Sequence, residues 1–150
     1  MNNLLENFQK HTAEFLDAIA LFPENSRALA PEGEWSAAFV VHHVADGELH
    51  FAARYLHTLG SDNPVMVYFE EERYPDALHY AKRSVAKSLA SIAGIRAMVF
   101  EVLSVIDESA WSRTTTTLDG NTFTLAEIFA KADSHLVSHT EQLIALKSQI

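Results

Sequence analysis

Apolar residues recur at intervals of three and four positions along four stretches of the chain, and this spacing places them on one face of an α-helix. The first helix is predicted over residues 2 to about 21 and ends before Pro23. The second runs from 37 to about 58, the third from about 75 to 106, and the fourth begins after Thr124. Amphipathic helices of this kind bury their apolar faces against one another. The pattern therefore predicts an all-α fold, an antiparallel four-helix bundle.

Residues that favour helix ends stand at the expected boundaries. Ser36 precedes the second helix, where its hydroxyl can accept a hydrogen bond from the first turn of backbone, and Gly60 stands near that helix's end. Pro75 suits the first turn of the third helix, because a first-turn residue needs no N–H donor. Thr124 and Glu127 have the spacing of a capping box at the start of the fourth helix.

Two of the connections have features of their own. The long loop after the second helix, residues 59–74, is hydrophobic for a loop and is expected to cover a cavity mouth or to lie at a dimer interface. The segment 107–123, before the fourth helix, is predicted to be a short hairpin-like insert. Its threonine run favours strand, and Asp119-Gly120 favours a tight turn. Without a repeat or a linker, the chain is expected to form a single domain over residues 1–150.

The composition narrows the classes of function. A chain of 150 residues that is 48% hydrophobic can form one soluble domain, and no apolar run approaches the roughly 20 residues that a membrane span needs. The N-terminal residues have no basic region and no apolar signal core, and the chain has no cysteine, so we expect a cytoplasmic protein. A formal charge of −9 makes nucleic acid an unfavourable partner, and no basic helix suggests binding to a membrane surface.

Three of the eight histidines stand at inward positions of the predicted bundle from which their rings could meet at one point. His135 and His139 lie four residues apart in the fourth helix, so their rings point the same way, one turn apart. His43 lies on the inner stripe of the second helix, whereas His42 points about 100° away. The three inward histidines are candidate ligands of one metal ion. The alternative is that each is a core residue with a hydrogen-bond partner of its own.

The choice of metal follows from the ligands that the chain can offer. Without cysteine these are His, Asp, Glu and water, which favours zinc, nickel, iron or manganese over ions that select thiolates. Three neutral imidazoles and one open position are typical of a catalytic zinc-type centre. A metal-bound water at the open position can ionise near neutral pH and attack an electrophile, and a thiol or a substrate oxygen can take the same position.

The residues around these histidines resemble the DinB/YfiT-like family of metalloenzymes, and the resemblance spans nearly the whole chain. The shared residues form two motifs about ninety residues apart, Trp35-Ser36 with His43-Val44-Ala45-Asp46, and His135-x-x-x-His139 with Gln142. The resemblance implies a four-helix bundle, frequent homodimers, and a divalent ion such as zinc or nickel bound by His43, His135 and His139. It also implies metal-dependent hydrolysis, or transfer and isomerisation reactions that use low-molecular-weight thiols.

Four further residues are candidates for roles around the ion. Asp46, three residues from His43, could orient a ligand or act as a base, with a surface or capping role as the alternative. Gln142 could hydrogen-bond a ligand imidazole or line the helix interface. His50 and Arg54 continue the inner stripe and could line the cavity above the site, with a surface or packing role as the alternative for each. Seven residues of helix rise about 10 Å, too far for His50 to share an ion with His43.

Three classes of function remain open at this point. The first is a metal-dependent enzyme acting on a small-molecule substrate, either a hydrolase or a low-molecular-weight-thiol S-transferase. The second is a metal-containing stress-response or binding protein without turnover. The third is a helical interaction protein whose histidines only pack. An accessible pocket beside a bound ion distinguishes the first class, and the third predicts no bound ion.

Overall fold

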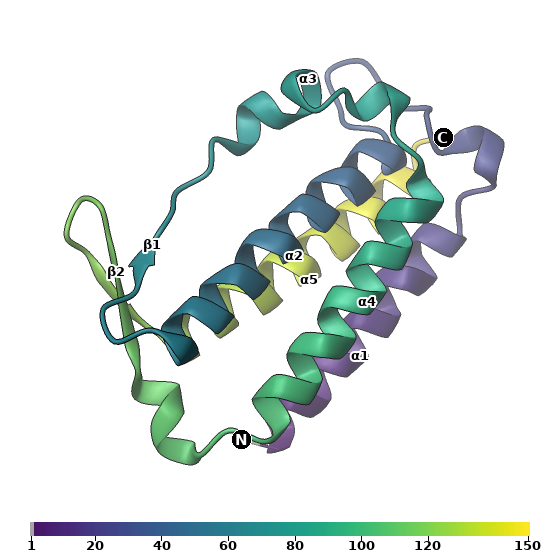
Figure 1. The fold of residues 1–150 in the computed structure, drawn as a ribbon. Helices are drawn as coiled ribbons and strands as arrows, with labels where there is room; N and C mark the ends of the chain where they lie inside the picture. Colours follow the sequence, from purple (N-terminus) through teal and green to yellow (C-terminus); the bar gives the residue numbers. More distant parts are fainter. Residues whose placement is uncertain (1) are drawn as a thin grey trace.

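Four long helices dominate the computed structural model, which describes residues 2–150 (Figure 1). They are α1 (Asn2–Ala20), α2 (Ala37–Gly60), α4 (Val85–Ser104) and α5 (Leu125–Lys147). The prediction of an all-α four-helix bundle is confirmed. None of the helices in this described part of the chain has the length and apolar character that a membrane crossing requires.

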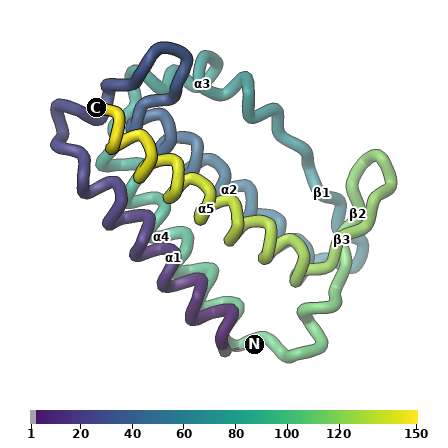
Figure 2. The backbone as a smooth tube through the Cα atoms, turned by 180° about the vertical axis from the view of Figure 1, so that it is seen from behind, coloured from purple at the N-terminus to yellow at the C-terminus, as the bar shows by residue number. Residues whose placement is uncertain are grey.

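The helices form a ring in which α2 contacts α4 and α5, and α1 contacts the same two helices. After α2, the long connection runs back along the bundle before α4 begins (Figure 1). As a result α4 runs in the same direction as α2, and α1 and α5 run in the opposite direction (Figures 1 and 2). The antiparallel neighbours are therefore α2 with α5 and α1 with α4. This arrangement brings the first half of α2 beside the last half of α5.

The apolar stripes of the four helices meet in two hydrophobic clusters. One cluster includes Phe15, Phe22, Val40, Val41 and Leu136, and the other includes Phe8, Phe51, Tyr55, Trp111 and Phe129. All ten side chains are buried, and the predicted stripe residues Phe8, Phe15 and Val40 are among them. Burial of a large apolar side chain contributes on the order of 1.5–3 kcal/mol, so these clusters are the main source of stability.

The predicted caps of α2 and α5 are present. The Ser36 hydroxyl accepts a hydrogen bond from the Phe39 N–H at 3.3 Å. At the start of α5, the Thr124 hydroxyl accepts from the Glu127 N–H at 3.2 Å, and the Glu127 carboxylate accepts from the Thr124 N–H at 2.8 Å. The capping box read from the sequence is confirmed.

The prediction of one continuous helix over residues 75–106 is wrong in its first third. A short helix α3 (Tyr74–Ala77) is followed by a 3₁₀ turn η3 (Tyr80–Lys82), and α4 begins only at Val85. His79 adopts the left-handed region with φ of 50°, which breaks the helix. Ser84 is the true N-cap of the long helix, with its hydroxyl accepting from the Lys87 N–H at 3.3 Å.

Contacts with Asp46 account for the position of this broken segment. Arg83 donates to both carboxylate oxygens of Asp46, at 2.7 and 2.9 Å, and the Tyr80 hydroxyl donates to the same carboxylate at 2.8 Å. A bidentate arginine–carboxylate pair is among the stronger polar contacts in proteins. The segment before α4 is therefore held against α2 rather than continuing the helix.

The hairpin before α5 is present and is part of a small sheet. Strands β2 (Thr114–Thr117) and β3 (Thr122–Thr124) pair antiparallel, after a 3₁₀ turn η4 (Glu108–Ser112). The long connection adds a strand that the sequence did not predict, β1 (Val65–Met66), parallel to β2. The sheet order β1-β2-β3 ties the start of that connection to the end of the bundle. The remaining 3₁₀ turns are η1 (Glu24–Ser26) and η2 (Glu71–Arg73).

A charged network crosses the middle of the bundle. The Arg96 guanidinium, 1% exposed, donates to the Glu48 carboxylate at 2.7 Å, and the Glu48 side chain is itself 2% exposed. The same guanidinium donates to the Thr12 hydroxyl at 2.6 Å and lies 3.3 Å from the Asp133 carboxylate. These contacts link all four long helices through one buried cation. A buried charge that loses a partner is strongly destabilising.

We predict that Glu48→Gln lowers the free energy of unfolding by about 3 kcal/mol, because an isosteric change removes the charge opposite Arg96 without opening a cavity. The matched control is Glu14→Gln, which breaks an exposed pair with Lys10 and should change stability little. Urea denaturation measures both. Equal stabilities for the two variants would contradict an energetic role for the buried pair.

Candidate metal centre

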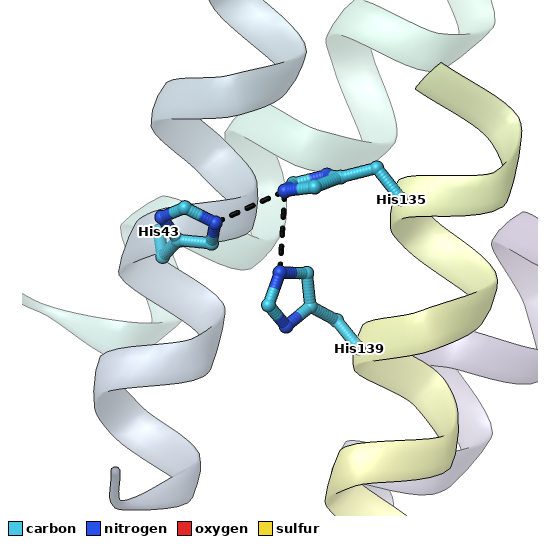
Figure 3. Close-up of side chains that lie close together, drawn as sticks. All are labelled: His43, His135 and His139. Atoms are coloured by element: carbon cyan, nitrogen blue, oxygen red, sulfur yellow. Dashed lines mark hydrogen bonds between the residues drawn. The ribbon is translucent and has the colours of Figure 1, made fainter. Parts of the chain in front are cut away.

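Three imidazoles converge between α2 and α5 (Figure 3). The Nε2 atom of His43, on α2, lies 3.0 Å from the Nε2 atom of His135, on α5. The Nε2 atom of His139 lies 3.2 Å from that same His135 atom. One ring nitrogen from each residue lies within 4.8 Å of those of the other two. The three histidines selected from the sequence are therefore brought together at one point.

Helix geometry accounts for this convergence. His135 and His139 lie one turn apart on α5, and His43 lies on the antiparallel α2 that packs against it. Gly47, one turn after His43, gives the His135 ring its space. A Cβ atom at position 47 would lie only 3.1 Å from Cε1 of His135. Any larger residue there would press on the imidazole.

The spacing of the three nitrogens fits a divalent ion. Metal–nitrogen bonds of about 2.0–2.1 Å in tetrahedral geometry place two ligand nitrogens about 3.3–3.4 Å apart. The distances of 3.0 and 3.2 Å to His135 approach that value. The nitrogens of His43 and His139 lie within 4.8 Å of each other, so side-chain adjustment can bring all three nitrogens to a common ion.

The protons available also favour an ion. Nδ1–H of His139 donates to Oε1 of Gln142 at 2.8 Å, which leaves its Nε2 without a proton when the ring is neutral. At most one of the two close contacts can then be an N–H···N hydrogen bond donated by His135. The other close nitrogen pair then has no hydrogen bond between its members, an unfavourable contact that a cation between the rings relieves.

The electrostatic surroundings keep the ligands neutral. Burial lowers the pKa of His43 to about 4, and a nearby charge on His139 lowers it as well. Burial lowers the pKa of His135 to about 3, and its two histidine neighbours have the same effect. The pKa of His139 is lowered too, mainly by burial. At pH 7 all three rings are therefore unprotonated and available as ligands.

An open hollow of about 410 Å³ leads to the three rings. Its walls include Trp35, whose ring centroid lies 5.1 Å from that of His43, and Gln142, which orients His139. The other polar lining residues are three carboxylates, Glu34, Glu71 and Glu72. A cavity of this size can accommodate a small molecule beside the ring nitrogens.

Glu71 was not identified from the sequence. It lies on η2 within the long connection, and its Oε2 atom is 3.7 Å from Nε2 of His43. The only local signal was the acidic run Glu70-Glu71-Glu72, which resembles any solvated surface segment. The hydrophobic character of residues 59–74 suggested that this loop could cover a cavity, but it did not indicate which of its side chains would face the histidines.

The other candidate residues lie outside the hollow. His50 stacks on Phe69 with 4.1 Å between ring centroids, and its Nε2 lies 2.8 Å from the Tyr74 hydroxyl. Arg54 donates to the Val67 carbonyl at 3.2 Å. His50 and Arg54 both line a separate hollow of about 150 Å³ under the long connection.

Asp46 does not line the hollow with the histidines; its carboxylate is bound by Arg83 and Tyr80. The neighbouring His42 is buried, and its Nδ1 lies 2.9 Å from the Ser88 hydroxyl.

Gly47→Ala tests the space that the site requires. The added methyl group should displace the His135 ring and weaken divalent-metal affinity about tenfold, the scale of losses when a ligand's orientation is disturbed. Gly94→Ala is the control, since its Cβ would meet no atom within 4 Å. It should raise stability by about 0.5–1 kcal/mol and leave metal affinity unchanged. Equal zinc affinity for Gly47→Ala and wild type, in competition with a chelator, would refute this role of the glycine.

Comparisons with known proteins agree with this fold. YfiT from Bacillus subtilis, described as a probable metal-dependent hydrolase with an unusual four-helix bundle topology, superposes with a TM-score of 0.80 at 17% identity. The match covers 95% of this chain and 84% of YfiT. The mycothiol-dependent maleylpyruvate isomerase superposes with a TM-score of 0.77 at 16% identity, over 95% of this chain and 60% of the isomerase.

The sequence itself identifies the family. No curated protein sequence matches the chain. The profile of the DinB superfamily does match it, over residues 3–143, which include the three histidines, Gln142 and the long connection between α2 and α4. The chain therefore belongs to the DinB superfamily.

Proposed function

We propose that this protein is a metal-dependent enzyme that binds a divalent ion through His43, His135 and His139 and acts on a small molecule. The observation that carries the proposal is the approach of three neutral Nε2 atoms, at 3.0 and 3.2 Å, at the end of an open hollow. A closed cavity would favour a non-catalytic metal protein. The hollow here gives a small molecule access to the ligand nitrogens.

An ion at this position supplies a Lewis acid that lowers the pKa of a coordinated water or thiol. The chain's own residues prepare the site for it. Gln142 holds the Nδ1 proton of His139 and so directs the bare Nε2 toward the ion. Trp35 forms an aromatic wall beside His43, against which an apolar part of a substrate can pack. Zinc and nickel suit three imidazoles best, and iron or manganese can occupy the same ligands.

Hydrolysis is the reaction that we favour. YfiT, described as a probable metal-dependent hydrolase, matches this chain over most of both lengths. Thiol-dependent transfer or isomerisation is the second candidate, because the mycothiol-dependent isomerase shares the fold over 95% of this chain. The open side of the three histidines can admit either a water or a small thiol. As in the sequence-based prediction, we propose a homodimer in the cytoplasm.

Metal content tests the proposed ligands. The untagged wild-type protein is expected to contain about one divalent ion per chain, and His135→Ala to lose it, because two imidazoles remain where three are needed. The control, His57→Ala, removes an exposed histidine outside the cluster and should retain the ion. Metal per chain is measured by elemental analysis after dialysis. Retention of the ion by both variants would refute the proposed site.

Assays of the zinc-loaded and nickel-loaded protein separate the candidate reactions. Ester and amide panels test hydrolysis, and electrophiles supplied with low-molecular-weight thiols test transfer. Turnover that disappears in His139→Ala supports an enzyme of the corresponding kind. Turnover no faster than that of His139→Ala in both panels would indicate a binding protein instead.

A further inference from the structure

We propose that Glu71 is a fourth residue of the metal centre, its carboxylate facing the open side of the ion and contributing to its binding. This inference rests on the proposed function, because it requires an ion at the three histidines. It adds a residue that comes from neither α2 nor α5. The carboxylate belongs instead to η2, in the connection that returns along the bundle.

The distance supports this assignment. The Oε2 atom of Glu71 lies 3.7 Å from Nε2 of His43, which is longer than a hydrogen bond. The carboxylate is not among the side-chain atoms that lie within 4.8 Å of one another at the three histidines, so it stands beside that cluster on the His43 side, where it can face an ion held there. Among residues 2–150, no hydrogen bond engages the Glu71 carboxylate. Its side chain is 46% exposed, so it can adjust its position without disturbing the core.

Contacts on both sides of Glu71 fix the connection in place. Before it, Arg54 donates to the Val67 carbonyl at 3.2 Å. After it, the Tyr74 hydroxyl lies 2.8 Å from Nε2 of His50, and Arg83 binds Asp46 through two hydrogen bonds. These anchors all lie on α2, the helix that carries His43. From the sequence, Asp46, His50 and Arg54 are candidates for roles around the ion. In the structure these residues hold the segment that presents Glu71.

The negative charge of the Glu71 carboxylate favours the binding of a divalent ion beside it. Three neutral imidazoles leave a divalent ion with its full charge at the end of a half-open hollow, and an anion beside it lowers the energy of the bound state. Carboxylates are also common ligands and outer partners of zinc in sites that contain histidine. Glu72 lines the same hollow and carries the same charge, but no contact joins it to a histidine in the described chain. It is therefore a matched control.

The experiment compares zinc affinity in the full-length, untagged protein by competition with a chelator. Glu71→Gln should weaken zinc binding about tenfold or more, as loss of an ordered partner at a metal site does. Glu72→Gln should bind zinc like wild type. Thermal unfolding of the ion-free variants should match wild type, which would show that the loss arises at the site and not from the fold.

Equal zinc affinity in Glu71→Gln and Glu72→Gln, whether unchanged or equally reduced, would overturn this inference. An unchanged affinity would show that Glu71 contributes nothing, and an equal loss would indicate only the general negative charge of the hollow. Neither outcome touches the three histidines. Their failure would be seen separately, as zinc binding that survives His135→Ala.

Discussion

The close packing of α2 against α5 at one end of the bundle is the constraint on which the site depends. His43 projects from one helix and His135 from the other, and their Nε2 atoms come to 3.0 Å because Gly47 presents no side chain to the ring. Apolar burial on both helices supplies the free energy that holds the rings together. Only one of the two nitrogen contacts at His135 Nε2 can be a hydrogen bond donated by His135, and the other is a local cost that a bound cation would remove. Local cost of this kind is characteristic of functional sites.

The long connection after α2 supplies part of the wall of the hollow beside the histidines. It turns back along the bundle and is fixed to α2 at two places, by Arg54 and His50 near its middle and by the Asp46–Arg83 pair near its end. Glu71 and Glu72, which lie between the Val67 and Tyr74 contacts, form the acidic side of the hollow. The buried Arg96–Glu48 pair holds the helices together some distance along α2 from His43. The helix α2 therefore carries a candidate metal ligand, one member of a buried ion pair, and the residues that anchor the connection.

Local patterns account for the parts of the molecule that the sequence predicted. Helical periodicity placed His135 and His139 one turn apart and His43 on the inner stripe of the second helix, and the resemblance to the DinB/YfiT-like family implied the same three residues as ligands. The break before α4 was missed because its apolar stripe continues through residues that a left-handed His79 and the Ser84 cap take out of the helix. Glu71 was missed for a different reason. Its place depends on contacts between segments far apart in the chain, and no local periodicity encodes those contacts.

The most direct test of this account is a crystal structure of the zinc-loaded protein, with anomalous scattering recorded at the zinc absorption edge. The account predicts one strong peak between α2 and α5, bonded to Nε2 of His43, His135 and His139 at about 2.0–2.1 Å. A peak elsewhere on the molecule, or a peak at this position without His43 among its ligands, would contradict it.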